Sequence, residues 1–511
     1  MKSVVSNDEL RKLILDSVNM LCDTVSSTLG PSGNNVLISN YDTSPFITND
    51  GVTIAESIDS EDKRIQAILE IIKEASLKTN EVVGDGTTTT LVLLQSIYNL
   101  GLKEVIKGKN SIKLKEELDI ILDKLINKIC KYKKIAKKED LINIATVSTN
   151  SKELGEFLTD LYLKIGSVYG IKVEEGNKEE TYYKINKGYN ILINELNNLY
   201  FTNEKEIVLN NVYLLLINGY LDNLELISEI INEGLNRNKN IVIIANENSE
   251  IVKEQILLYN LQEHKNIYVI SVSEYGEKKF NIMKDIEYIS ESKMKNIEYD
   301  NILWKDLGYV NKVIIKKDEI VIESEKDNKE LIDKIKEEIE ITKDIYDKDY
   351  LEKRMANLSN SCATIYVGGI TNTEIKEKKM RIIDGLCSLK TANDGVVIGE
   401  GITLLKLSEE LNDNIISEKI IKESLKIPFI KILENSGINY LEIYEKIRKS
   451  NYNLIYNIET KSFDNIESTK IIDPLLVLVE ALKNAVSIAG MLLTTNYLVI
   501  NEEEKERKIE F

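Results

Sequence analysis

Residues 84–90 read Gly84-Asp85-Gly86-Thr87-Thr88-Thr89-Thr90, and the apolar run Leu91-Val92-Leu93-Leu94 follows at once. Glycines let a backbone approach a phosphate, and a helix that starts behind them offers free N–H groups and a positive dipole end. Threonine hydroxyls add donors, and Asp85 supplies the carboxylate oxygen that Mg²⁺ prefers. The stretch therefore predicts a phosphate site. The alternative is a glycine turn with a threonine N-cap on an ordinary helix. It is not a Walker loop, because no Gly-Lys-Ser/Thr follows.

Two more glycine turns precede this stretch: Thr28-Leu29-Gly30-Pro31-Ser32-Gly33 and Thr48-Asn49-Asp50-Gly51. Taken singly, each is typical of a plain turn. Apolar residues at helical spacing surround them and predict a mostly helical block with one short strand. The helices are expected at residues 10–25, 65–80, 87–102 and 114–130, and the strand at 36–39.

The middle of the chain has a different pattern. Apolar runs at 212–217, 241–245 and 267–272 are strand-like, and helical stretches at 224–236 and 251–260 separate them. This alternation predicts an α/β domain. After Gly395 the chain becomes helical and apolar again, so we expect a helical unit that is split by an α/β insertion.

Bulk properties exclude several classes of function. Hydrophobic residues make up 43% of the 511 residues, and the formal net charge is −18 with no basic blocks, which argues against nucleic-acid and membrane partners. Residues 475–495 have the length of a bilayer span, but Glu480, Lys483 and Asn484 lie among them, so a buried core helix is expected. The four cysteines form no CxxC pair, and the start has no signal-peptide layout, so we expect a cytoplasmic protein.

The three glycine segments, in this order, resemble the nucleotide signature of the chaperonins. Later segments resemble the GroEL-type, group I class: Lys376-Glu377-Lys378-Lys379-Met380-Arg381-Ile382-Ile383-Asp384, Ile472-Asp473-Pro474, and the run from Ala485 to Thr495. The resemblance implies a multidomain α+β chaperonin fold. In this fold a helical equatorial ATP-binding domain (1–131 and 395–511) is split by an intermediate domain (132–187 and 363–394) and an α/β apical client-binding domain (188–362).

The same resemblance implies a site for ATP, Mg²⁺ and K⁺. Matching positions for nucleotide binding are Thr28, Leu29, Gly30, Pro31, Asn49, Gly51, Asp85, Gly86, Thr87, Thr88, Thr89, Val147, Ser148, Gly399, Asn457, Ile471 and Asp473. Asp85 is the implied metal ligand. Asp384 is the implied catalytic carboxylate that orients the attacking water, and Asp50 assists it. Asn49 replaces the usual lysine of this class, and Glu400 interrupts a triple glycine.

The function that follows from the resemblance is ATP-driven folding of non-native polypeptides inside a ring. The implied partners are further copies of the chain in one or two seven-subunit rings, unfolded clients, and a co-chaperonin cap. Client binding is expected at Tyr200, Phe201, Ile231, Leu257 and Leu258, because non-directional apolar contact suits many clients. The alternative is a ring holdase or structural particle with little ATP turnover. A group II chaperonin with a built-in lid is disfavoured, because the middle third has no extra segment.

Overall fold

The computed structural model describes residues 2–39, 45–186, 188–196, 200–201, 206–263, 266–342, 344–359, 362–458, 460–466 and 469–501. The chain folds into two compact units. Unit 1 combines Met1–Tyr162 with Glu377–Phe511, and unit 2 is Leu163–Lys376. The prediction of a helical unit split by an α/β insertion is therefore confirmed. The finer division into equatorial, intermediate and apical domains stays a prediction.

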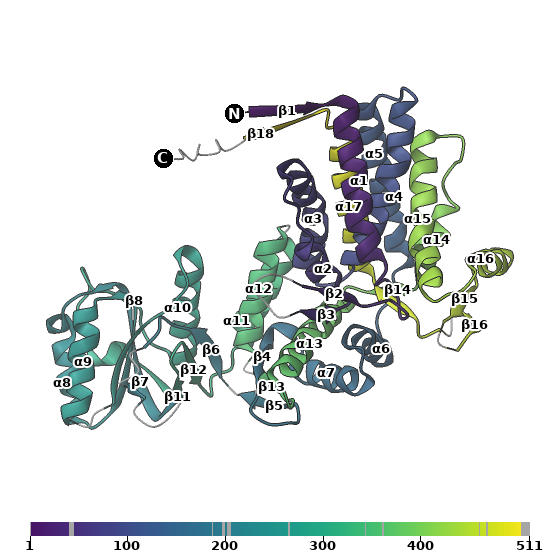
Figure 1. Cartoon of the computed structure of the whole chain (residues 1–511). Helices are drawn as coiled ribbons and strands as arrows, with labels where there is room; N and C mark the ends of the chain where they lie inside the picture. The colour runs from purple at the N-terminus through teal and green to yellow at the C-terminus, as the bar shows by residue number, and fades with distance from the viewer. Residues whose placement is uncertain are drawn as a thin grey trace. The chain divides into compact units, whose positions relative to one another are not determined.

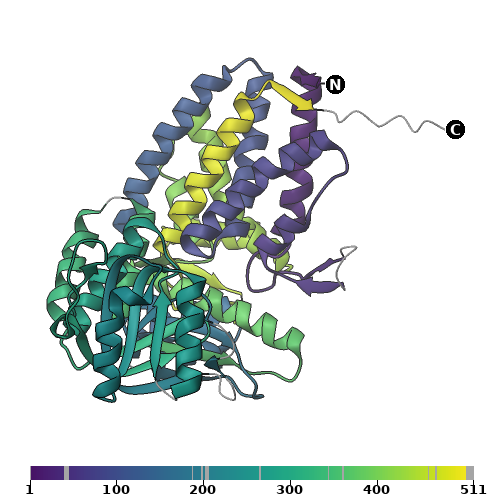
Figure 2. The same ribbon diagram turned by 90° about the vertical axis from the view of Figure 1, so that its left-hand side faces the viewer.

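Unit 1 is built around long helices that run side by side (Figure 1 and Figure 2). The helices of the first segment are α1 (Asn7–Ser26), α2 (Gly51–Ser57), α3 (Lys63–Val83), α4 (Thr87–Ile106), α5 (Ser111–Ile129), α6 (Lys138–Thr149) and α7 (Lys152–Ile165). In the second segment they are α13 (Asn372–Asn393), α14 (Ile402–Ser408), α15 (Ile416–Asn435), α16 (Tyr440–Lys449) and α17 (Leu475–Thr494). The expected helices near 10–25, 65–80, 87–102 and 114–130 correspond to α1, α3, α4 and α5.

Apolar side chains from both segments form one core in unit 1. Helix α1 contributes a stripe at helical spacing, whose members Leu10, Ile14, Val18, Leu21 and Val25 are all buried. Helix α17 packs against α3, α4 and α5. Among the described helices it alone has the length and hydropathy of a membrane span, and most of it is buried inside the unit, as expected of a core helix.

Short strand pairs close the edges of unit 1. Strand β1 (Lys2–Ser6) pairs antiparallel with β18 (Tyr497–Asn501), so the two ends of the described chain lie side by side (Figure 1). Strand β2 (Val36–Ile38) pairs with β3 (Phe46–Thr48), which confirms the short strand expected at 36–39. The remaining pairs are β14 (Val396–Ile398) with β17 (Ile472–Pro474), and β15 (Leu454–Asn457) with β16 (Ser462–Asn465).

Unit 2 contains a sheet in the order β6-β12-β11-β7-β8-β9, with β10 beside β7. Strands β7, β8 and β9 are parallel, whereas β11 pairs antiparallel with β7 and β12. The bounds are β6 (Tyr189–Leu192), β7 (Ile207–Leu221), β8 (Asn240–Asn248), β9 (Ile267–Ser271), β10 (Lys295–Asn296), β11 (Gly308–Ile315) and β12 (Glu319–Glu323). Strands β7 and β8 contain the apolar runs expected at 212–217 and 241–245, and β9 covers all but the last residue of the run expected at 267–272.

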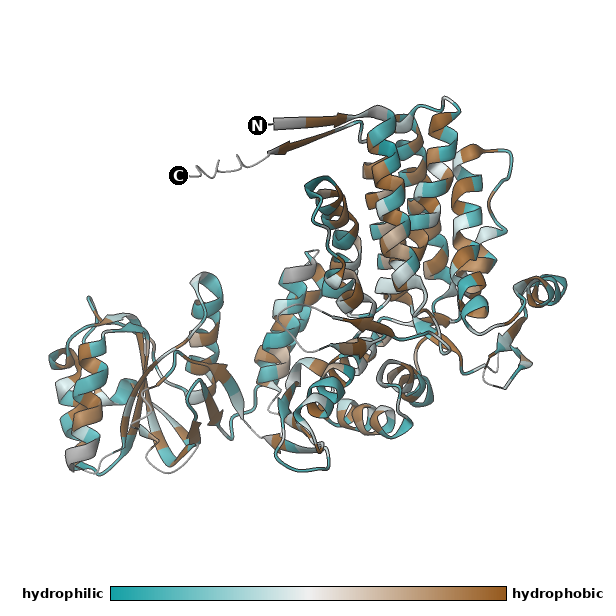
Figure 3. Cartoon of the chain, in the orientation of Figure 1, coloured by the Kyte–Doolittle hydropathy of each residue, from teal (hydrophilic) through white to brown (hydrophobic). Residues whose placement is uncertain are grey.

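Both faces of this sheet are covered by helices, which explains the unbroken apolar runs. Leu214 and Leu216 belong to one apolar cluster and Leu215 and Ile217 to the other, because successive strand residues point to opposite faces. Helices α8 (Ser228–Asn236) and α9 (Glu250–Glu263) pack on one face, and α10 (Gly276–Ser290), α11 (Lys329–Ile341) and α12 (Ile345–Leu358) on the other. Figure 3 colours these strands largely brown between the more polar helices.

A second, smaller sheet completes unit 2. Strand β13 (Cys362–Val367) lies between β4 (Ile171–Glu175), to which it is parallel, and β5 (Tyr182–Asn186), to which it is antiparallel. An ion pair joins the two sheets, since Lys172 Nζ in β4 lies 2.8 Å from a carboxylate oxygen of buried Glu319 in β12. Only then does the chain return to unit 1 through α13.

Candidate functional site

The Gly84–Thr90 stretch forms a left-handed turn between two helices. Gly84 ends α3 with φ +67°, and Gly86 precedes α4 with φ +78°. This backbone region favours glycine. Gly86 itself is the N-cap of α4 and no side chain caps the helix, so the threonine cap of the alternative interpretation is not formed. The first N–H groups of α4 are therefore available to an anion.

The second glycine turn lies against the start of α4. Asp50 is the N-cap of α2, and its carboxylate accepts hydrogen bonds from the backbone N–H groups of Val52 and Thr53. A Cβ atom on Gly51 would lie 2.4 Å from Oγ1 of Thr88 and 2.9 Å from Oγ1 of Thr87. Only glycine fits at this contact, so the fold places Asp50 beside the turn formed by Gly84–Thr90.

Helix α13 approaches the same turn from the other side. A Cβ atom on Gly84 would lie 2.4 Å from Cβ of Cys387, so α13 and the turn are in close contact. One turn of helix before Cys387 is Asp384, a half-buried residue. The residue after Cys387, Ser388, shares a hydrogen bond of 2.6 Å with the hydroxyl of Ser148 in α6. Asp384 and Ser148 are thus brought to the site by one helix contact, whereas the Val147 side chain is 79% exposed.

Electrostatic coupling shows that four aspartates share this site. Desolvation raises the pKa of Asp384 to about 7, and the charges of Asp50 and Asp85 add to this rise. Desolvation and the charge of Asp85 likewise raise the pKa of Asp473 to about 7. The pKa of Asp85 is also raised, although solvent reaches its side chain, because crowding by protein atoms desolvates it and Asp50 lies near. A cation would relieve this concentration of negative charge.

The segment around Gly399 joins the site through Asp473. Gly399 donates its N–H to the carbonyl of Ile471 at 3.1 Å, and a Cβ on Gly399 would lie 2.9 Å from Oδ1 of Asp473. Glu400 follows with φ +52°, a left-handed conformation that L side chains rarely adopt. Glu400, which interrupts the triple glycine, therefore retains a backbone conformation that is typical of glycine.

Several of the remaining residues that match nucleotide-binding positions lie on the C-terminal segment of unit 1 or pack against it. Gly30 has φ +87° and packs on Ile432 of α15, and Leu29 packs on the same apolar cluster as Ile471. The Asn435 amide of α15 holds this turn by donating to the carbonyls of Ser26 and Leu29, each at 2.9 Å. Thr28 is buried, and Pro31 and Asn49 are exposed.

Asn457 lies in the hairpin formed by β15 and β16. Its amide oxygen accepts the N–H of Thr460 at 3.1 Å, and its nitrogen donates to Asp464 at 3.4 Å. These bonds fix the amide within the hairpin. Asn457 therefore has a defined orientation at the end of β15, and its part in nucleotide binding stays a prediction.

The residues present suit a nucleotide that brings Mg²⁺ with it. Within the described ranges, no group of three or more His, Cys, Asp and Glu side chains could hold a metal ion. Mg²⁺ needs no such cage, because it is commonly held by one or two carboxylates together with phosphate oxygens and water. Asp85 adjoins the uncapped start of α4, so the metal and phosphate sites would be contiguous.

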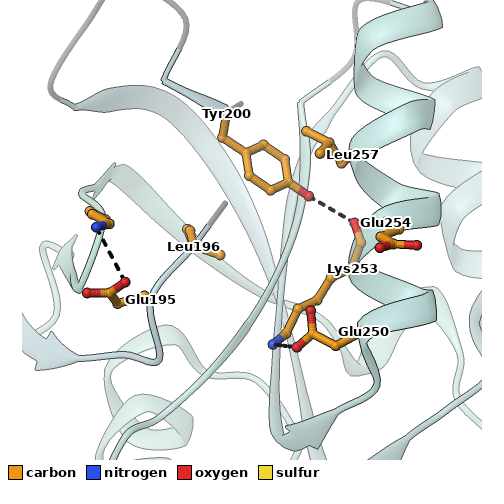
Figure 4. A pocket seen from close by; sticks show the side chains of 8 residues that line it. Glu195, Leu196, Tyr200, Glu250, Lys253, Glu254 and Leu257 are labelled. Atoms are coloured by element: carbon orange, nitrogen blue, oxygen red, sulfur yellow. Dashed lines mark hydrogen bonds and ion pairs between the residues drawn. The ribbon is translucent and has the colours of Figure 1, made fainter. Parts of the chain in front are cut away.

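The predicted client residues lie on unit 2 and differ widely in exposure. Ile231 and Leu257 are 7% and 6% exposed, so both belong to the core and offer little surface in this structure. Leu258 is 55% exposed, and Tyr200 and Phe201 are half-buried. Tyr200 donates to the carbonyl of Lys253 at 3.4 Å and lies across from Leu257 (Figure 4).

Sequence reasoning missed Ile251, which is 64% exposed on the same helix as Leu258. The signal was present in the helical period. Ile251 and Leu258 are seven residues apart and lie on one face of α9, whereas Val252 and Ile256 are four apart and face the core. The helix therefore has an exposed apolar pair beside its buried one.

Comparison with known proteins agrees with this architecture. The model of the TCP-1/cpn60 chaperonin family matches residues 21–222 and 222–503. The chain belongs to this family.

Solved structures of other chaperonins share the fold. The chaperonin gp146 from the bacteriophage EL 2 (Pseudomonas aeruginosa), crystallised in presence of ATP-BeFx, is 20% identical with a TM-score of 0.80 in crystal form I, over 98% of this chain and 99% of that chain. A group III chaperonin in the open state is 19% identical with a TM-score of 0.64, over 96% of this chain and 98% of that chain. The chaperonin fold is thus confirmed, and the finer assignment to group I stays a prediction.

Proposed function

We propose that this chaperonin binds ATP with Mg²⁺ in unit 1 and uses ATP hydrolysis to drive the binding and release of non-native polypeptides on unit 2. The observation that carries the proposal is the meeting of Asp50, Asp85 and Asp384 at the uncapped start of α4. A scaffold that turned over no ATP would have no chemical need for three carboxylates at this place. K⁺, implied by the resemblance, belongs to the same proposal.

Each part of the site has a role in this reaction. The N–H groups at the start of α4 hold phosphate oxygens and stabilise the charge that develops in phosphoryl transfer. Asp85 would hold Mg²⁺, which neutralises phosphate charge when it is bound. Asp384 accepts a hydrogen bond from the attacking water and directs it toward the terminal phosphate, and Asp50 supports that orientation from the start of α2. Since desolvation and the charges of Asp50 and Asp85 raise the pKa of Asp384 to about 7, a bound cation would favour its ionised form at neutral pH.

The wider cycle is part of the same proposal. Rings of identical chains, clients held by exposed apolar residues of unit 2 such as Leu258, and a co-chaperonin cap are what the resemblance implies. Seven subunits per ring and a cytoplasmic location are also proposed. Within the described residues the cysteines form no disulfide, which suits a reducing compartment.

Steady-state phosphate release by the purified protein with Mg²⁺ and K⁺ tests the proposal. We expect turnover in the wild type, and a loss of at least about a hundredfold in Asp384→Ala with nucleotide binding retained, because positioning of the water is what is removed. Asp394→Ala is the matched control, since Asp394 is exposed just beyond the same helix. Absence of turnover in intact wild-type oligomers that still hold clients would overturn the ATPase proposal and favour the holdase.

A further inference from the structure

A pocket of about 240 Å³ lies in unit 2 at the carboxyl ends of β8 and β9. Because β7, β8 and β9 are parallel, these ends meet at one edge of the sheet, which is where open α/β sheets commonly bind ligands. The nucleotide site of unit 1 does not use this pocket. Its lining includes Asn194, Glu247, Asn248, Lys253, Tyr275 and Lys279.

Lys279 is a buried cation without a matching carboxylate. Lys279 is only 9% exposed, and its Nζ donates a hydrogen bond to the backbone carbonyl of Asn246 at 3.0 Å. The ring of Tyr275 lies 5.5 Å from Nζ. In the described part of the chain, no carboxylate forms an ion pair with Lys279. A buried charge that is compensated by one carbonyl is costly, so its position at a pocket favours an anionic ligand.

Two more features of the pocket favour an anion that carries an amide. Asn248 has both amide atoms buried, and neither has a hydrogen-bond partner within the structure. Helix α10 starts beside the pocket after Tyr275, and no side chain caps it. Glu247 opposes an anion, but it is exposed, whereas Lys279 is buried. An extended peptide that carries a carboxylate supplies an anion for Lys279 and backbone amide groups that can pair with the Asn248 side chain.

A second pocket of about 380 Å³ adjoins the first. Lys253 lines both pockets, and the chain passes from Asn194 in the first to Leu196 in the second. Leu196, Tyr200 and Leu257 make one side of this second pocket apolar (Figure 4). Two ion pairs lie in its lining, because Lys253 contacts Glu250 at 2.6 Å and Lys317 contacts Glu195 at 3.3 Å, and Glu254 also lines it. The apolar side of the second pocket therefore adjoins the first pocket, which contains the unpaired cation of Lys279.

We propose that the Lys279 pocket binds the side-chain carboxylate of an extended polypeptide whose neighbouring apolar side chain enters the Tyr200–Leu257 pocket. The inference rests on the proposed client binding by unit 2 and names its substrate class. Unit 2 then prefers segments in which Asp or Glu stands within a few residues of an apolar side chain. Apolar contact alone provides no such preference.

Fluorescence anisotropy of the full-length protein with two labelled peptides tests the inference. The peptides are apolar heptamers that differ only in a central Glu or Gln. We expect the wild type to bind the Glu peptide about tenfold more tightly or better, because the Lys279 bond is charge-assisted. Lys279→Met should abolish this preference, and Lys278→Met, on the exposed adjacent position, should keep it.

Thermal unfolding of the same variants separates binding from structure. Lys279→Met should be as stable as the wild type or more stable, because it removes an uncompensated buried charge. A less stable variant that binds both peptides more weakly to the same degree would show that Lys279 only supports Asn246, and would overturn the inference.

The other outcomes are equally distinct. Equal binding of the two peptides by the wild type overturns the acidic preference and leaves client binding intact. Binding of neither peptide overturns both the inference and the proposed client function of unit 2. Competition by inorganic phosphate but not by acetate would show that the pocket recognises phosphate, and would also overturn the inference.

Discussion

Glu400 combines two unfavourable features in a single residue. It has φ +52° where glycine is the residue that adopts this conformation without cost, and it adds a carboxylate directly after Gly399, whose backbone lies against Asp473. We expect Glu400→Gly to stabilise unit 1 by about 1 kcal/mol through relief of backbone strain, and to tighten nucleotide binding through loss of charge. Chemical unfolding and nucleotide titration measure the two effects.

Glu400→Gln separates them, because it removes the charge and keeps the strained backbone. This variant should bind nucleotide more tightly than the wild type with unchanged stability. Unchanged affinity in Glu400→Gln would show that the carboxylate does not act on the site.

The shared pKa rise of Asp384 and Asp473 makes the stability of the nucleotide-free protein depend on pH. Their folded pKa values of about 7 exceed the usual 3.8, so the folded state binds protons more tightly than the unfolded state. The stabilisation from these protons is complete below about pH 4 and is lost as the pH rises through about 7. Urea unfolding at several pH values should show this loss in the wild type and not in the Asp384→Asn/Asp473→Asn variant. Parallel pH profiles would contradict the assignment.

Two strand pairs of unit 1 present apolar side chains on their outer faces. Val4 and Val499 are register partners with exposures of 61% and 60%, while neighbouring Val5 is buried. Leu37 and Ile47 are register partners in the β2–β3 hairpin, with exposures of 67% and 65%. Figure 3 colours much of both pairs brown. Small two-stranded pairs with apolar outer faces are marginal alone, so we expect them to be covered by another copy of the chain.

Substitution of the hairpin tests this expectation. Leu37→Lys/Ile47→Lys should dissociate the oligomer, because two charges cannot be buried at an apolar contact without partners. Light scattering after size exclusion measures the mass. Ile341→Lys, at a position 78% exposed in unit 2, is the control and should leave the mass unchanged. An intact oligomer in the double variant would place the subunit contact elsewhere.

At the scale of the whole molecule, the two units have separate apolar cores. We expect two calorimetric transitions. Mg²⁺ and ATP should stabilise only unit 1, by about 2.7 kcal/mol when the nucleotide concentration is a hundred times Kd, and should therefore raise the temperature of its transition alone. Gly51→Val should remove that shift, because its side chain would collide with Thr87 and Thr88. A nucleotide-dependent shift of both transitions would show that the units unfold together.

Local patterns in the sequence were enough to predict the class of fold and the outline of the nucleotide site. The glycine turns, the helical spacing of residues 10–25 and the apolar strand runs are local patterns, and local patterns follow from backbone sterics and side-chain periodicity. Two-sided burial of β7 was also foreseeable, since its apolar run does not alternate with polar residues.

Tertiary structure alone decided which side chains share an environment. Asp473 couples electrostatically to Asp85, almost four hundred residues earlier, because two distant segments build one unit. Ile231 and Leu257 suited client binding by residue type, yet packing placed them in the core. In the sequence Lys279 resembles any other lysine of a helix, and only the fold shows that it is buried without a carboxylate partner among the described residues. Burial and charge compensation depend on contacts between distant residues, which no local pattern specifies.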